Sequence, residues 1–202
     1  MNKGVISVLV AYLIWGLYPF YFHAMQHVAP AEIVIHRVLW TFALLAVYLF
    51  CSRRWRWIQK AVTDKRTVAV FLMSSALITA NWSTYTYAIV TNQTLEASLG
   101  YFMNPLVSVL LGTVFLKEKL NKAQMLAIIF ACAGVMWVTF KQGEFPALGL
   151  TLALTFGFYG LVRKMAPLGS LEGLTLETAF AFPVALLATF YFAGNGDLTF
   201  VN

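Results

Sequence analysis

The chain has 202 residues, of which 60% are hydrophobic and 11% are charged, and its formal net charge is +6. Soluble domains carry charge on about a quarter of their residues, so this composition excludes a water-soluble globular protein and indicates that most of the surface faces lipid. The basic residues lie in short gaps between apolar runs, and this distribution argues against nucleic acid as a partner.

Seven apolar runs follow one another along the chain. A helix needs about 20 apolar residues to cross the hydrocarbon core of a bilayer, and Pro, Gly, Asn and charged residues punctuate the gaps between the runs. The runs cover residues 4–22, 33–51, 68–90, 97–116, 123–140, 148–162 and 174–193. The first run is too long for the apolar segment of a signal peptide. The sequence therefore predicts an all-α, polytopic membrane helix bundle with seven spans.

Basic residues gather in alternate gaps. The gap after the second run holds six of them, the gap after the fourth holds three, and the gap after the sixth begins with Arg163 and Lys164. Together with Lys3, these gaps hold twelve of the fourteen basic residues. Because loops rich in Lys and Arg stay cytoplasmic, we predict a multi-pass protein of the bacterial inner membrane with a cytoplasmic N-terminus. The Arg and Trp residues at 53–57 then lie beside the bilayer, where we expect them to anchor on anionic lipid.

Two short segments indicate an internal repeat. The run Trp-Gly-Leu-Tyr at 15–18 is echoed by Phe-Gly-Phe-Tyr at 156–159. Five spans precede the second copy, and an odd number of spans inserts the next unit upside down. Inverted repeats of this kind are a recurring construction of secondary transporters. We therefore predict a first five-helix repeat over 1–144 and the first two helices of a second repeat over 145–202, with three further helices expected beyond a truncated end.

Ionisable groups inside a span are costly, so each one is a candidate functional residue. Arg37 lies about one turn into the second run and offers five donors that suit a carboxylate or phosphate on a substrate. Alternatively, Glu32 or a backbone carbonyl pairs with it for structural reasons. Glu177 is a candidate for ion coupling, or else a helix-start carboxylate that complements the positive end of a helix dipole. Glu96, at the start of the fourth run, has the same two interpretations.

Polar side chains also occur inside the third and fourth runs. Asn81 and Tyr85 are four residues apart and share a helix face, where they either line a cavity or form hydrogen bonds between helices. Pro105 has no N–H group, so the carbonyl of Tyr101 loses its helical partner, and Asn104 lies beside this break. Such a break needs protein or a watery cavity around it. The predicted substrate-binding residues are Arg37, Asn81, Tyr85, Tyr101 and Asn104.

Other features have plainer explanations. Gly149, Ala153 and Gly157 form a stripe that predicts close helix packing. His23 and His27 are four residues apart but have no third ligand nearby in sequence, so we predict no metal site. The sequence has no cluster of nucleophile, base and orienting partner, so we expect neither an enzyme nor a cofactor.

Several longer motifs resemble those of a known family. They are AYLIWG at 11–16, HRV at 36–38, LEASLGYFMNPLV at 95–107 and FYGLVRK at 158–164. Through them the chain resembles the EamA-type drug/metabolite transporter superfamily, and within it the RarD-like branch. The resemblance implies ten helices in two inverted five-helix units, of which this chain would contain seven.

These observations favour a secondary transporter that exports a small organic metabolite or drug-like solute by alternating access. The sequence contains no Gly-x-x-x-x-Gly-Lys loop, so we expect an ion gradient or the substrate gradient to supply the energy. The alternative is a seven-helix membrane receptor or another non-transporting integral membrane protein. The expected partners are a small-molecule substrate and the lipid bilayer, and self-association into a homo-oligomer stays open.

Overall fold

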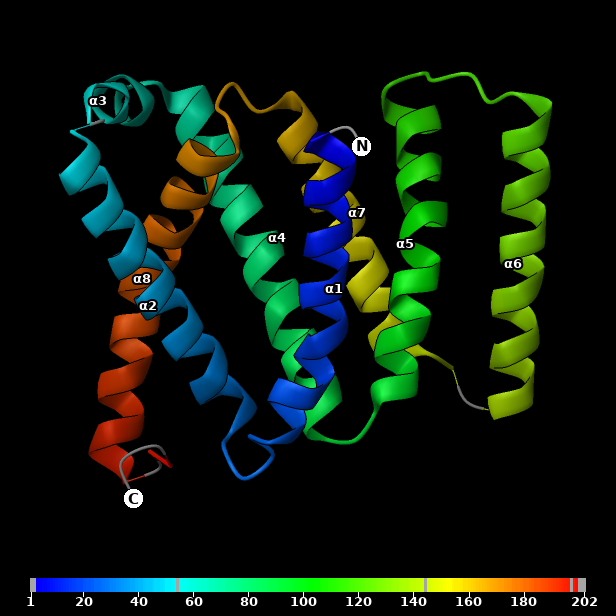
Figure 1. The fold of residues 1–202 in the computed structure, drawn as a ribbon, viewed down its shortest axis with the longest axis horizontal. Coiled ribbons are helices and arrows are strands. Elements are labelled where there is room, and N and C mark those ends of the chain that lie inside the picture. The colour runs from blue at the N-terminus through cyan, green and yellow to red at the C-terminus, as the bar shows by residue number, and fades with distance from the viewer. Residues whose placement is uncertain (1–2, 54, 144, 197, 200–202) are drawn as a thin grey trace.

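The structure is a computed structural model that describes residues 3–53, 55–143, 145–196 and 198–199. Within these residues it has eight α-helices and no β-strand (Figure 1). The helices are α1 Lys3–His23, α2 Pro30–Ser52, α3 Arg56–Thr63, α4 Lys65–Val90, α5 Thr94–Phe115, α6 Lys122–Gln142, α7 Ala147–Met165 and α8 Ser170–Asn195.

Among the described residues, six helices are long and apolar enough to cross a membrane, namely α1, α2, α4, α5, α6 and α8. They coincide with six of the seven predicted spans and confirm an all-α, polytopic membrane protein. The remaining prediction, at 148–162, coincides with α7, which is helical but is not one of the six. Its last turn carries Arg163 and Lys164, whose charges lower its mean hydropathy. In Figure 1, α7 nevertheless runs between the same two ends of the molecule as its neighbours.

The short helix α3 was not predicted. Trp57 and Ala61 lie four residues apart on its inner face and pack against a cluster that contains Phe71 of α4. Arg56 and Lys60, on the other side, are exposed. Figure 1 shows α3 lying across one end of the molecule. A short amphipathic helix in this position is typical of the boundary between membrane and water.

The basic gaps all lie at one end of the bundle. Figure 1 shows the start of α1, the helix α3, the α5–α6 connection and the α7–α8 connection together at the same end. This arrangement agrees with the alternation predicted from the Lys and Arg residues. Which end faces the cytoplasm stays a prediction.

Local sequence signals set several helix ends. Pro30 occupies the first turn of α2, where its missing N–H group costs nothing. Asn121 and Gln124 form a reciprocal capping box at the start of α6. Asp64 caps α4, and hydrogen bonds from the hydroxyl and N–H of Thr67 lower the pKa of the Asp64 carboxyl.

The most extensive helix contact joins α5 and α7, and it confirms the close packing predicted from the small-residue stripe. Gly149, Ala153 and Gly157 are all buried on α7. A Cβ atom added at Gly149 would lie 2.9 Å from the carbonyl oxygen of Glu96, and one added at Gly157 would lie 2.6 Å from a methyl carbon of Val107. Larger side chains would therefore force the two helices apart.

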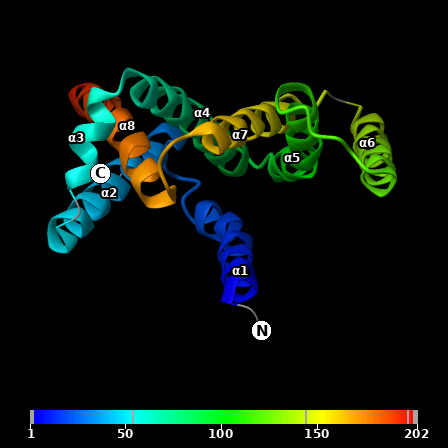
Figure 2. The ribbon, with the colours of Figure 1, turned by 90° about the horizontal axis from the view of Figure 1, so that it is seen from above.

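The helices form a single layer with two outlying members. In the layer, α2 packs on α8 and α4, α4 packs on α7, and α7 packs on α5. Figure 2 shows α1 projecting away from this layer and α6 standing at one end of it beside α5. No residue in the apolar window of α6 is buried, and α1 buries only 6% of its window. Residues of α1 nevertheless line both cavities of the candidate site described below.

Candidate functional site

A cavity of about 420 Å³ lies among α1, α2, α4, α5 and α7, and we call it the central cavity. A second cavity of about 700 Å³, the side cavity, lies among α1, α2, α4 and one residue of α8. The two share Tyr18, Arg37 and Trp82, so they adjoin at these side chains. Volumes of a few hundred Å³ are typical of sites for small organic ligands.

All five residues predicted to bind a substrate line the central cavity, although they come from three different helices. They are Arg37, Asn81, Tyr85, Tyr101 and Asn104. The structure therefore brings the whole predicted set together, while their role in binding stays a prediction.

Sequence reasoning missed the contribution of α1 to this cavity. Tyr12, Trp15 and Tyr18 line it. These aromatic residues recur every three positions, and residues three apart are neighbours on a helix surface. That spacing is the signal in the sequence that could have found them.

Arg37 is held by aromatic side chains. Its guanidinium carbon lies 4.0 Å from the centre of the Trp82 ring, a cation–π contact. Among the ion pairs between described residues, none contains Arg37. The predicted alternative, pairing with Glu32, is not what the structure shows, because Glu32 is buried and accepts hydrogen bonds from the N–H (2.9 Å) and hydroxyl of Thr199.

Asn81 combines both of its predicted roles. Its amide nitrogen donates to the carbonyl oxygen of Leu152 and to the hydroxyl of Thr155, both at 3.0 Å, so it forms hydrogen bonds between α4 and α7. The same side chain lines the central cavity. Because its donors are engaged by α7, we assign Asn81 chiefly to holding that wall in place.

Tyr85 and Tyr101 meet edge to face, with ring centres 5.8 Å apart. Tyr85 is buried, and its position between α1 and α5 gives the cavity a firm aromatic wall. Beside it, α5 continues unbroken through Pro105. The side-chain oxygen of Asn104 is buried there and receives no hydrogen bond from the described residues. A donor group on a bound molecule would satisfy it.

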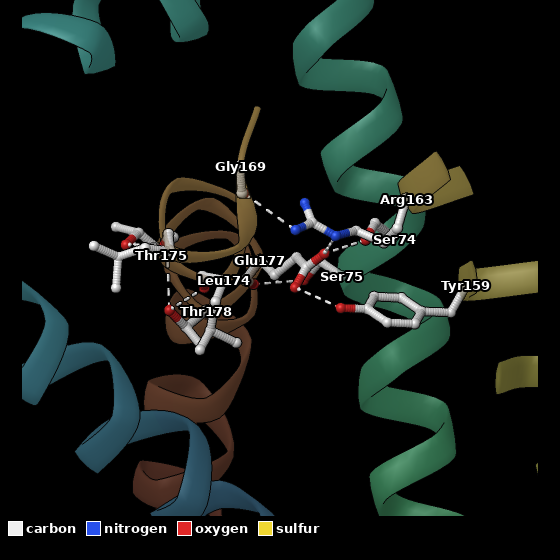
Figure 3. Close-up of polar contacts among 10 residues, drawn as sticks. Ser74, Ser75, Tyr159, Arg163, Gly169, Leu174, Thr175, Glu177 and Thr178 are labelled. Atoms are coloured by element: carbon white, nitrogen blue, oxygen red, sulfur yellow. Dashed lines mark hydrogen bonds and ion pairs between the residues drawn. The ribbon is translucent and has the colours of Figure 1, made fainter. Parts of the chain in front are cut away.

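Glu177 lies outside both cavities, in a buried polar cluster (Figure 3). It is 1% exposed, and its carboxylate accepts hydrogen bonds from the hydroxyls of Ser74 and, at 3.3 Å, of Tyr159. Arg163 of α7 pairs with it at 3.7 Å from Nε to Oε1. The cluster therefore ties α4, α7 and α8 together near the basic end of the bundle.

This geometry corrects one prediction about Glu177. Because α8 begins at Ser170, Glu177 lies about two turns inside the helix, and its interpretation as a helix-start carboxylate is wrong. The sequence also predicts that Arg163 lies in a basic loop, whereas in the structure it lies in the last turn of α7 and its side chain is 17% exposed. A role for Glu177 in ion coupling stays a prediction.

Glu96 also lies outside the two cavities. It occupies the first turn of α5, and its carboxylate accepts the N–H of Leu148 at 2.9 Å, in the first turn of α7. Glu96 thus complements the start of the neighbouring helix as well as lying at the start of its own. Its proposed part in ion coupling is untested by these contacts.

Comparison with known proteins gives a consistent result. The model of the EamA-like transporter family matches residues 2–140. The chain belongs to the EamA-like transporter family. This EamA-like chain is 42% identical over 188 residues to the uncharacterized transporter YojE of Bacillus subtilis and 40% identical over 193 residues to an uncharacterized transporter of Pseudomonas aeruginosa. It is 39% identical over 194 residues to the protein RarD of Salmonella typhi.

These matches use nearly the whole of this EamA-like chain but not of its relatives. They cover 92%, 96% and 96% of the chain, and 63%, 65% and 66% of the three relatives. The chain therefore spans just under two thirds of their length. No solved structure matches it.

Proposed function

We propose that this chain forms part of a secondary transporter of the bacterial inner membrane, which exports a small organic solute by alternating access and binds it in the central cavity. The observation that carries the proposal is the convergence of Arg37 with two tyrosines and two asparagines, from three helices of an EamA-like protein, on one cavity. Convergent polar groups in a mostly apolar pocket are the usual form of a small-molecule site.

The aromatic lining suits a drug-like or metabolic solute. Apolar walls bind the body of such a molecule, and a few polar groups set its orientation. Arg37 lies where the central and side cavities adjoin. A solute at this position would contact α1, one of the two long helices that bury little of their surface against the layer.

Ion coupling would involve Glu177 and Glu96, each of which links neighbouring helices. Glu177 ties α8 to α4 and α7, and Glu96 ties α5 to α7. Protonation of either carboxylate would weaken its tie and change how these helices pack. We propose this as the route by which a proton gradient acts on the cavity.

Cysteine labelling tests alternating access without a known solute. Asn104→Cys, in a chain whose Cys51 and Cys132 are replaced by Ser, is treated with a membrane-impermeant maleimide in right-side-out and inside-out vesicles. A cavity that opens alternately exposes this cysteine in both preparations. Leu126→Cys, on the exposed face of α6, is the control that should react in neither, because lipid covers it. Reaction of the cavity cysteine from neither side would sink the proposal.

A further inference from the structure

The charges around the two cavities have a single sign. Among the described residues that line them there is no Asp and no Glu, and Arg37 is the one side chain that is always charged. The other basic side chain among the lining residues is that of His36. A positively charged solute would find no carboxylate here, whereas a negatively charged one would find a guanidinium.

Among the described residues, no acidic side chain forms an ion pair with Arg37. The other polar side chains that line the central cavity include Tyr18, Tyr85 and Tyr101, and none of the described lining residues is a carboxylate. The guanidinium carbon of Arg37 lies 4.0 Å from the centre of the Trp82 ring. The guanidinium also offers a fork of five N–H donors, which can bind an anion while the contact with the ring is kept.

A partly buried, unpaired charge is expensive in a membrane protein. It is retained at little net cost when a ligand of opposite charge binds there. One guanidinium balances one negative charge, and its fork of donors matches a carboxylate. A phosphate monoester carries about −1.5 to −2 at neutral pH, which this cavity would leave partly uncompensated.

The walls define the rest of the ligand. Aromatic rings surround Arg37 in the central cavity, and ring-to-ring contacts favour a planar apolar body. They come from α1, α4, α5 and α7, and are Tyr12, Trp15, Tyr18, Trp82, Tyr85, Tyr101 and Phe156. The unsatisfied side-chain oxygen of Asn104 adds one acceptor for a hydroxyl or N–H on that body.

We propose that the central cavity selects aromatic monocarboxylates, with the carboxylate on Arg37 and the ring against the tyrosines and tryptophans. This inference rests on the proposed function, since it names the class of solute for the same cavity. It separates the protein from a carrier of organic cations, which would require a carboxylate where this cavity has a guanidinium.

Binding of three probes of similar shape tests the proposal. They are 3-phenylpropionate, which is an anion, 3-phenylpropanamide, which is neutral, and 3-phenylpropylammonium, which is a cation. Titration calorimetry of the full chain in nanodiscs of zwitterionic lipid measures each one, and empty nanodiscs correct for partition into lipid. We expect 3-phenylpropionate to bind tightest.

Three substitutions locate the effect. Arg37→Gln should weaken binding of 3-phenylpropionate by about tenfold or more, since a hydrogen bond to a charged group contributes about 1.5–3 kcal/mol, and should leave the amide little changed. Lys141→Gln is the matched control: Lys141 also lies over a tryptophan ring, that of Trp137, at 5.4 Å, but on α6 away from the cavities. It should have no effect. Arg37→Lys, which keeps the charge, should retain part of the preference and shows whether loss of folding explains the result.

The outcomes distinguish this inference from the proposed function. Tightest binding of 3-phenylpropylammonium, weakened by Tyr101→Ala, would overturn the anion preference and leave the cavity as the solute site. Undiminished binding of 3-phenylpropionate to a folded Arg37→Gln variant would also overturn the preference. If no probe binds above the lipid background, both the preference and the solute-binding role of the cavity fall.

Discussion

The contact between Arg163 and Glu177 makes the clearest prediction about stability. Arg163→Met removes the cationic partner of a carboxylate that is 1% exposed, while most of the methylene stem of the side chain is preserved. Breaking a buried ion pair in this way costs about 3–5 kcal/mol. We expect the low end, about 3 kcal/mol, because the hydroxyls of Ser74 and Tyr159 still donate to Glu177.

A double-variant cycle isolates the pair. Glu177→Gln removes the charge and keeps one oxygen acceptor, so one of the two hydroxyls, which donate to different oxygens, keeps its partner. Adding it to Arg163→Met should restore part of the lost stability, with a coupling energy of about 2 kcal/mol. The assay is equilibrium unfolding by SDS in dodecyl maltoside micelles, followed by circular dichroism.

The adjacent residue supplies the control. Lys164 pairs with Glu118, but both side chains are more than half exposed. Exposed ion pairs contribute about 0–1 kcal/mol, so Lys164→Met should change the unfolding free energy by less than 1 kcal/mol. If Arg163→Met costs no more than Lys164→Met, or if the Arg163 and Glu177 effects simply add, the pair does not stabilise the hairpin as reasoned here.

Three further predictions follow from the helix contacts and ends. Gly157→Ala should lower the unfolding free energy by about 1–3 kcal/mol in the same assay because its methyl group overlaps the side chain of Val107, whereas Gly134→Ala, with open space around it, should be neutral or stabilising. Asp64→Ala should lower the melting temperature at pH 7. Because the folded-state pKa of Asp64 is lowered, the stabilisation by its carboxylate is fully present above the unfolded pKa of about 3.9 and is lost as the pH falls through the folded-state pKa. The difference in melting temperature between the variant and the original chain should therefore vanish in acid. With a cytoplasmic N-terminus, the connection after α5 is cytoplasmic and the connection after α6 is periplasmic. Alkaline phosphatase fused after Lys119 should therefore be inactive, and the same reporter fused after Gly143 should be active. The reverse pattern would contradict a cytoplasmic N-terminus.

Much of the fold follows from the sequence, because a membrane span is a local property. In lipid every backbone N–H and C=O group must be satisfied within the segment, so an apolar run of about 20 residues has helix as its only stable form. Six of the predicted spans coincide with helices of sufficient length and hydropathy. The short helix α3 was missed because its contact with Phe71 of α4, rather than its own hydropathy, holds it in place.

The candidate site was predictable to a lesser extent. The cost of placing Arg37 inside a span marked it as functional, and the same reasoning led to Asn81 and Asn104, all of which line the central cavity. The sequence could not show which partner each group takes. Asn81 reaches α7, and Glu96 reaches the start of the same helix, more than fifty residues away along the chain.

By itself, then, the sequence determined the membrane class, the positions of the spans, the asymmetry of basic loops and the polar residues that are candidates for a site. That these residues line one cavity is a finding of the structure. Only the tertiary structure decided the pairing of Arg163 with Glu177, the aromatic contact of Arg37 and the absence of an acidic residue from the described cavity lining. The reason is physical. Hydropathy is summed along one segment, whereas a contact between helices depends on the rotation and depth of both, which the packing of the whole bundle sets.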